Sequence, residues 1–338
     1  MLEIKLLPTS EVEISGEIPS GDFMSGRSRA LKELADNIEI DGFRKGKAPE
    51  NILLQKVGMD ALLEKMAVIA LEKEYVKIIE SQKIKAIGRP EITITKMAEN
   101  NPLGYKIKTA VLPDITLPDY KSIAAKTIKE TKKEIIVEDK EMEDIIERLR
   151  KSRASKNDKR EEILPELNDD FAKTLGKFEN LEALKKTIKE NLLAEKKVKE
   201  KERMRMEILE KITEKVEEVM PKLLVEAEKG KMMEEMKMNI LQMGLKWEDY
   251  LAHIKKTEEE LRKDWEKDAE KRVKHGLILE EIAAKEKLEA TPEELEKETK
   301  AITEYYKGLG KEIDPQRTRD YLVGVIKNEK VFKILESQ

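Results

Sequence analysis

Between two segments with helical spacing of apolar residues stands the stretch Gly42-Phe43-Arg44-Lys45-Gly46-Lys47-Ala48-Pro49. Residues 27–40 before it and 50–57 after it both repeat apolar side chains at intervals of three and four, which is typical of amphipathic helices. Gly42 and Gly46 permit a positive φ, and Pro49 suits a first helical turn, where its missing N–H costs nothing. The stretch therefore predicts a tight loop at the tip of a helix–loop–helix.

The side chains at the centre of this loop favour a contact with RNA. Arg44 and Lys45 attract phosphate, and the ring of Phe43 and the guanidinium of Arg44 can stack on bases. The alternative is an ordinary connection in which Phe43 folds back onto its own domain. A phosphate-binding P-loop is excluded, because it needs four residues between its glycines and a Ser or Thr after its Lys, whereas three separate Gly42 from Gly46 here.

The same stretch, followed by Glu-Asn-Ile-Leu at residues 50–53, closely resembles the signature of trigger factor, the bacterial ribosome-associated chaperone. In that family the loop docks on the large ribosomal subunit beside the exit of the nascent-chain tunnel. The resemblance implies ribosome-binding residues at the following positions: Gly42, Phe43, Arg44, Lys45, Gly46 and Lys47. It also implies as partners the exit-site ribosomal protein, the adjoining rRNA and nascent or unfolded polypeptides, together with homodimers of the free protein.

Composition limits the remaining function classes. The 338 residues are 41% charged and 4% aromatic, with a net charge of −4, which is typical of helices with solvated faces. Residues 1–119 carry 17 Lys and Arg against 19 Asp and Glu, so a general nucleic-acid binder is disfavoured and any RNA contact is local. There is no cysteine, no leader-like N-terminus and no stretch of membrane-spanning length, which predicts a soluble cytoplasmic protein without a membrane association.

The N-terminal part predicts a small α+β domain of antiparallel strands around the helix–loop–helix. Short strands are expected at residues 2–7 and 11–18, a helix at 60–82, and two further strands around residues 92–94 and 105–111. We expect this ribosome-binding domain to span residues 1–113. Residues 114–163 are expected to be a linker with one helix at 137–152, extended before that helix and polar and solvated at 151–163.

Residues 164–338 predict a mostly α-helical region, which the resemblance identifies as a C-terminal chaperone domain with helical arms. Leu164 to Lys173 resembles the family's return into this domain, and expected helices begin near residues 180, 221, 247, 257, 291 and 314. The helix that begins near residue 180 is expected to be exposed on every face at residues 199–203, where charged residues interrupt its apolar stripe. Most trigger factors carry an FKBP-type peptidyl-prolyl isomerase domain before this point. Only fourteen residues separate Arg150 from Pro165, so that domain is absent and we predict no enzyme activity.

Methionine supplies the candidate substrate-binding surface. Eight of the 14 methionines fall between residues 204 and 243, and flexible thioethers suit surfaces that accept many apolar partners. The alternative for any single one is a place in a helix–helix core. The candidates, which cover more than one helical face, are Met232, Met233, Met236, Met238 and Met243.

No residue set predicts catalysis, a cofactor or a metal. The only histidines, His253 and His275, are far apart in a chain without cysteine, and neither a catalytic triad nor a nucleotide loop occurs. The resemblance to trigger factor, together with the missing nucleotide loop, implies an ATP-independent chaperone that binds nascent or unfolded chains near the tunnel exit. The alternative is a helical scaffold or ribosome assembly factor that docks through the same loop without general clients.

Overall fold

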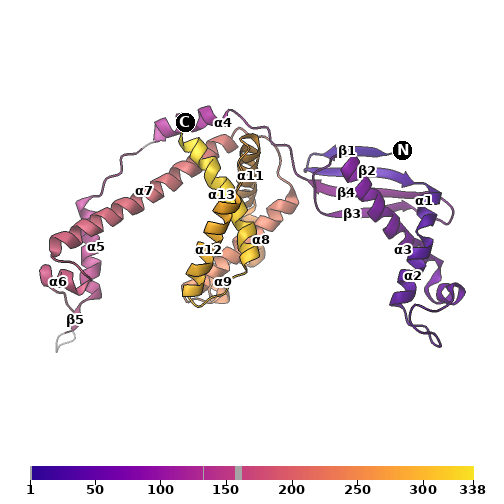
Figure 1. The fold of residues 1–338 in the computed structure, drawn as a ribbon, viewed down its shortest axis with the longest axis horizontal. Helices are drawn as coiled ribbons and strands as arrows, with labels where there is room; N and C mark the ends of the chain where they lie inside the picture. The colour runs from indigo at the N-terminus through magenta and orange to yellow at the C-terminus, as the bar shows by residue number, and fades with distance from the viewer. Residues whose placement is uncertain (1, 132, 157–161) are drawn as a thin grey trace. The chain divides into compact units, whose positions relative to one another are not determined.

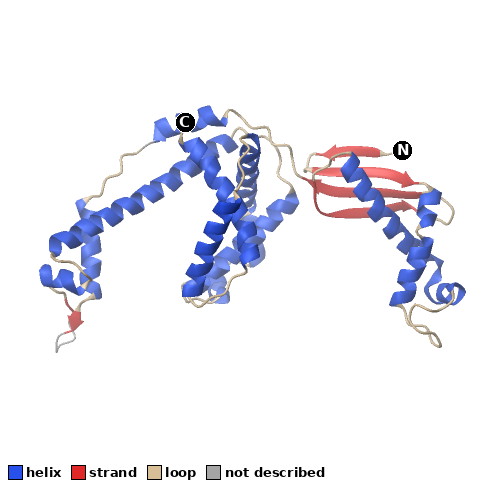
Figure 2. Ribbon diagram, in the orientation of Figure 1, coloured by secondary structure: helices blue, strands red, loops and turns tan. Residues whose placement is uncertain are grey.

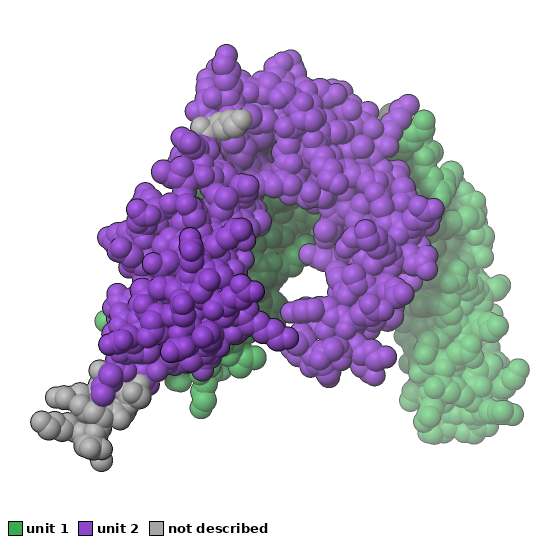
Figure 3. Space-filling view, turned by 60° about the vertical axis from the view of Figure 1, so that its left-hand side comes forward, with its two compact units in different colours: residues 1–116, 217–277 green, residues 117–216, 278–338 purple. Residues whose placement is uncertain are grey.

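The computed structural model describes residues 2–131, 133–156 and 162–338, and these divide into two compact units. One unit combines residues 1–116 with 217–277, and the other combines 117–216 with 278–338, as Figure 3 shows by colour. Strands occur mainly in the N-terminal part, and most of the rest is helical (Figure 2). The predicted fold class is confirmed: an α+β N-terminal part with antiparallel strands and a helix–loop–helix precedes a mostly helical C-terminal region.

The helices and strands are labelled in Figure 1. In the first unit lie β1 Glu3–Leu7, β2 Glu11–Ile18, α1 Ser20–Ser25, α2 Arg27–Asn37, α3 Glu50–Ser81, β3 Ala86–Lys96, β4 Leu103–Val111, α8 Lys222–Gln242, α9 Trp247–Ile254 and α10 Glu258–Asp264. In the second lie α4 Tyr120–Thr131, α5 Asp139–Ser152, β5 Ser155–Lys156, β6 Glu162–Ile163, α6 Asp169–Thr174, α7 Leu181–Thr213, α12 Pro292–Gly308 and α13 Pro315–Glu336. Residues of α11 Glu266–Lys285 belong to both.

The N-terminal sheet has the strand order β1-β2-β4-β3, with every neighbouring pair antiparallel. Ile14 on β2 lies opposite Ile107 on β4, and Ile107 lies opposite Ile92 on β3, so these side chains share one face. The apolar side of α3, including Leu62 and Met66, packs on that face in a single core cluster. Alternation along the central strands thus buries one face, as the sequence predicts.

One local feature of this part differs from the expectation, and another confirms it. A short helix, α1, precedes α2, because Phe23 is fully buried in the sheet core and draws its segment inward. The two helices expected after the loop are confirmed, because α3 is interrupted at Gly58, where φ is +84° and ψ is +160°, outside the helical region. A positive φ is accessible to glycine at no steric cost, so the chain kinks there between two helical segments.

The predicted extended linker after residue 113 is wrong in its second half. Residues 120–131 form α4, whose buried side chains Tyr120, Ala124 and Thr127 recur at helical spacing. This helix packs against α7 and α13. Two helices, α4 and α5, therefore occupy the interval expected to hold one. The compact units also join segments distant in sequence, so the division at residues 113 and 163 remains a prediction.

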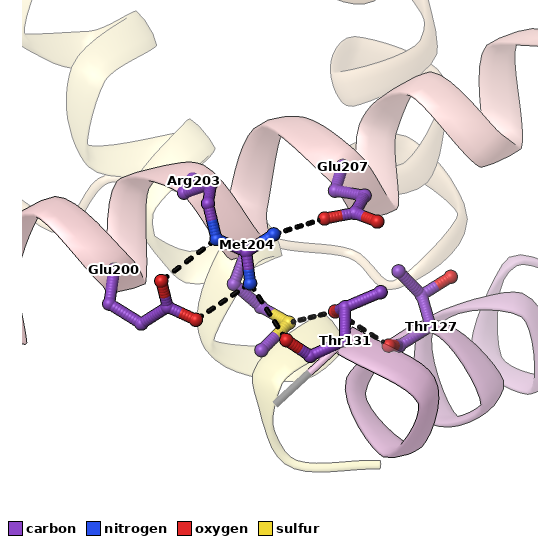
Figure 4. Close-up of polar contacts among 6 residues, drawn as sticks. All are labelled: Thr127, Thr131, Glu200, Arg203, Met204 and Glu207. Carbon is purple, nitrogen blue, oxygen red and sulfur yellow. Dashed lines mark hydrogen bonds and ion pairs between the residues drawn. The ribbon is translucent and has the colours of Figure 1, made fainter. Parts of the chain in front are cut away.

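The charged stretch at residues 199–203 is not exposed all round, because Arg203 binds α4 (Figure 4). Its guanidinium donates to Glu200 at 2.8 and 2.6 Å, to Glu207 at 2.5 Å and to the Thr131 carbonyl at 2.8 Å. The hydrogen bond to Glu200 is the main cause that raises the pKa of Arg203. The Thr131 hydroxyl also donates to the sulfur of Met204 at 3.2 Å. Arg203, one of the charged residues that interrupt the apolar stripe of α7, thus binds the end of α4.

Packing on α7 occurs at two separate places. Near its start, Leu184 and Ile188 join Ile146 of α5 and Phe171 of α6 in one cluster. Farther along, Arg205 binds Glu329 at 2.7 Å and also Glu336, both on α13. Ile188 and Arg205 are about 25 Å apart along the helix axis, at roughly 1.5 Å per residue. The long helix α7 therefore packs against α5 and α6 at one place and against α13 at another.

Residues 151–163, expected to be a polar turn, contain β5 and β6, which pair antiparallel. Residues 157–161 of that expected turn lie outside the described residues. Within the described ranges no helix combines the length and the apolar composition needed to cross a membrane.

Candidate functional site

The predicted loop at residues 42–49 lies between α2 and α3, and its two glycines have a positive φ, +83° at Gly42 and +76° at Gly46. The Gly46 N–H donates to the Ala35 carbonyl at 3.1 Å, which ties the loop back to the last turns of α2. A Cβ at residue 46 would collide with Oδ1 of Asp36, whereas a Cβ at residue 42 would meet open space. Both glycines are therefore required for conformation, and a side chain at residue 46 would in addition displace the exposed carboxylate of Asp36.

Ion pairs join the two helices that flank the loop. Arg27 at the start of α2 binds Glu50 at the start of α3 at 2.7 Å, and Glu33 binds Lys65 at 2.7 Å. The hydrogen bond from Lys65 is the main cause that lowers the pKa of Glu33. Pro49 is the N-cap rather than the first helical residue, so α3 begins at Glu50, one residue later than predicted. The loop therefore lies between two helices that also contact each other through ion pairs.

Phe43, Arg44, Lys45 and Lys47 are exposed, as predicted, and Phe43 keeps 42% of its surface accessible. Among the residues that the structure describes, none of the side chains of Arg44, Lys45 and Lys47 makes an ion pair. Three cations beside an exposed ring, with no carboxylate within residues 42–49, form a small surface for an anionic, aromatic ligand. RNA has both properties, since it combines phosphates with bases that can stack.

The structure divides the methionine candidates. Met233 is 1% exposed, so its proposed place on a binding surface is wrong for this conformation, and it is a core residue of α8. Met232 packs against the cluster around Met220, and Met236 is half-buried. Met238 and Met243 are 54% and 71% exposed. Of the five, only these last two present most of their thioether surface to solvent.

Two leucines that the sequence analysis did not select extend this surface. Leu241 and Leu245 are exposed beside Met238 and Met243 in the chain. We call these four residues the α8-end surface. The sequence signal that could have identified the leucines is Gly244, because a glycine here ends the helix and apolar residues stand on both sides of it. The structure confirms the break, with a φ of +75° at Gly244.

The α8-end surface is supported by a polar cluster on its flank. Lys237 binds Glu258 at 2.9 Å and lies 5.5 Å from the ring centre of Trp247, while the Trp247 indole donates to Glu258 at 2.7 Å. The hydrogen bond from Lys237 is the main cause that lowers the pKa of Glu258. These contacts fix α9 and α10 beside α8. Within the described ranges, no group of three or more His, Cys, Asp or Glu could hold a metal ion.

Family models match almost the whole chain. Residues 1–149 match the model described as bacterial trigger factor protein, and residues 180–336 match the model of the trigger factor C-terminus. Curated trigger factors are similar over nearly their full length. The protein of Caldicellulosiruptor bescii is 25% identical, with 97% of this chain and 94% of the relative covered, and that of Clostridium botulinum is 24% identical, with 99% and 98% covered.

The alignment to the Caldicellulosiruptor bescii protein spans 422 positions, more than this chain has residues, so that relative contains segments which this chain lacks. A solved structure is also similar, with a TM-score of 0.57, 20% identity and 99% of both chains covered. It comes from work on promiscuous substrate recognition in folding and assembly activities of the trigger factor chaperone.

Proposed function

Because this chain belongs to the trigger factor family of chaperones, we propose that it docks on the large ribosomal subunit through residues 42–49 and shields emerging polypeptides. The single observation that carries the docking proposal is the projecting loop, in which Phe43 and three cations are exposed without an internal ion pair among the described residues. The partners are the exit-site ribosomal protein and adjoining rRNA. The cations attract phosphate, and Phe43 and Arg44 stack on bases or pack on the protein.

The proposed clients are nascent or unfolded polypeptides with apolar segments. The α8-end surface offers two thioethers and two leucines at the end of a helix whose flank is fixed by Lys237 and Glu258. Flexible apolar side chains repack around different partners, which suits clients of unrelated sequence.

The cycle would need neither ATP nor isomerase activity. The sequence holds no nucleotide loop, and too few residues lie between Arg150 and Pro165 for the isomerase domain. Release would follow from weak, multivalent contacts and from the folding of the client. We place this activity in the cytoplasm, divide the chain at residues 113 and 163, and expect the free protein to form homodimers.

The test is co-sedimentation with ribosomes at several salt concentrations. The variant Phe43→Ala/Arg44→Ala/Lys45→Ala is compared with Lys73→Ala/Val76→Ala/Lys77→Ala, which removes the same charge and one exposed apolar side chain from α3. We expect salt-sensitive binding by the wild-type chain and the control, and loss of binding by the loop variant. Equal binding by all three chains would remove the docking role of the loop.

A second assay separates the chaperone from the scaffold or assembly factor. The chaperone suppresses the aggregation of several unrelated unfolded proteins at comparable molar ratios. A scaffold binds one partner and leaves the aggregation of the others unchanged.

A further inference from the structure

The edge strand β1 exposes an apolar row on the side of the sheet that α3 covers elsewhere. Ile4 lies opposite Ile14 and Leu6 opposite Val12. Directly opposed residues of antiparallel strands share a face, so Ile4 and Leu6 lie on the face where Ile14 and Val12 are buried. Nevertheless Ile4 is 38% and Leu6 72% exposed, and Leu2 just before the strand is exposed as well. The row continues the core face but has no cover among the described residues.

The two edges of this sheet are built differently. On the β3 edge, Gly88 has a φ of +71°, Pro90 lacks an N–H, and the register shifts at two places. Such bulges and prolines prevent the addition of another strand. The register of β1 with β2 is regular from Glu3 to Leu7 and contains neither glycine nor proline. Its outer N–H and C=O groups are therefore suited to an additional extended strand.

The sequence of this edge is complementary to itself. When two copies of Leu2-Glu3-Ile4-Lys5-Leu6 run antiparallel about a two-fold axis at Ile4, Leu2 faces Leu6, Glu3 faces Lys5 and Ile4 faces Ile4. The apolar side chains of both copies then lie on the same face, and both Glu–Lys pairs lie on the other.

The outer face of the sheet already uses such pairs. Glu11 binds Lys108 at 3.0 Å, and Glu13 binds Lys106 at 3.2 Å, each pair joining β2 to β4. Glu3 and Lys5 lie on this face, opposite Ser15 and Glu13. A Glu3–Lys5 contact between two copies would extend the same pattern across a two-fold axis.

We propose that the β1 edge binds the β1 edge of a second copy of this chain, so that two four-stranded sheets become one continuous sheet. The inference rests on the homodimer in the proposed function and names its surface. A client segment could also pair with the edge, but only a second copy supplies a glutamate opposite each lysine and a lysine opposite each glutamate by its own sequence. Because the buried area is small, a dissociation constant on the order of micromolar is expected.

Charge reversal tests this pairing in the full-length chain by sedimentation velocity over a range of protein concentrations. Glu3→Lys leaves two lysines on the strand and Lys5→Glu leaves two glutamates, so each variant repels itself. The two-fold axis places every substitution in two symmetry-related contacts. We therefore expect each single variant to raise the dissociation constant of the dimer at least about tenfold. The double variant Glu3→Lys/Lys5→Glu restores the complementarity and the wild-type dimer. An equimolar mixture of the two single variants forms a mixed dimer.

The mixture also controls for folding, because Lys5→Glu places a carboxylate opposite Glu13. A single variant that is monomeric only because β1 has detached would not be rescued by mixing, and that result would overturn the proposal. A wild-type chain that stays monomeric at about 100 μM, tenfold or more above the expected micromolar constant, would overturn both the edge pairing and the homodimer. Dimers that all variants form equally would overturn the edge pairing alone. Ribosome binding by Glu3→Lys reports separately on the docking loop.

Discussion

At the scale of single residues, the loop between α2 and α3 depends on two glycines for different reasons. Both have a positive φ, but only Gly46 also lies where a side chain would strike Asp36. The Gly46 N–H is bonded to Ala35 as well, so this residue determines how closely the loop returns to α2. Gly42 is free of neighbours and only has to permit the turn.

Gly46→Ala is therefore expected to destabilise the fold more than Gly42→Ala. A non-glycine residue in the left-handed region costs about 1–2 kcal/mol, which applies to both variants, and the collision with Asp36 adds to this cost only at residue 46. The free energy of unfolding is measured in urea for both variants. The excess cost of Gly46→Ala should disappear in an Asp36→Ala background. If the two variants remain equally stable, the contact with Asp36 does not constrain the loop.

Residue types and spacing predicted the exposed side chains of the loop but not the burial of individual methionines. Phe43 and its neighbouring cations are set apart by glycines and a proline, which act locally, so their exposure could be read from the sequence. Met233 and Met238 belong to the same helix and the same residue type, yet one is buried and the other exposed. Which face of α8 meets another helix depends on packing between distant segments, which a single helical pattern does not contain.

At the scale of elements, caps located most helices correctly. Asn180, Thr257, Thr291 and Asp314 each accept a backbone N–H at the start of a helix, as their positions in the sequence predict. The helix after Thr257 nevertheless ends at Asp264, and α11 begins anew after Trp265.

The failure at α4 has an identifiable cause. Pro113 and Pro118 suggested an extended path, but a proline restricts only the residues around it. Asp119 accepts from the Ser122 N–H at 3.2 Å, and Tyr120 and Ala124 begin the helical spacing. The helix signal was present in the sequence, and its packing on α7 and α13 stabilises it.

One cap also makes the α12–α13 hairpin sensitive to acid. Glu294 completes the capping box with Thr291 and binds Lys330 of α13 at 2.6 Å. The hydrogen bond from Lys330, followed by that from the Thr291 backbone, lowers the pKa of Glu294 to about 2 from an ordinary value of 4.5. A carboxylate whose pKa is lower in the folded state stabilises the fold above its unfolded pKa, and this contribution is lost as the pH falls toward the folded pKa.

Glu294→Gln should therefore lower the melting temperature at neutral pH while keeping the capping geometry, since Gln can also close a capping box. The difference from the wild-type chain should shrink as the pH falls from about 4.5 to about 2, where Glu294 becomes protonated. Thermal unfolding followed by circular dichroism across this range measures it. Glu293→Gln, outside the ion pair with Lys330, is the matched control. A difference that stays constant with pH would show that charge is not its source.

At the scale of the whole molecule, each compact unit is assembled from segments that are distant in the chain. Glu218 accepts the Thr116 N–H at 2.8 Å across 102 residues, and Arg205 binds Glu329 across 124 residues. Local patterns predicted an α+β part followed by a helical part, and the fold has that order. They could not predict that residues 217–277 group with 1–116, because such contacts depend on the folding of everything between them.

The two proposed activities use different side chains, so they should be separable by mutation. Met238→Gln/Leu241→Gln/Met243→Gln replaces three exposed apolar residues, which should leave the fold intact because none is in the core. We expect this variant to lose most of its suppression of client aggregation and to bind ribosomes like the wild-type chain. The loop variant Phe43→Ala/Arg44→Ala/Lys45→Ala should show the reverse. Met233→Gln is not a suitable probe, since burying its amide would unfold α8 locally and confuse binding with stability. If the α8-end variant protects clients as well as the wild-type chain does, the client surface lies elsewhere and the exposed thioethers have no part in it.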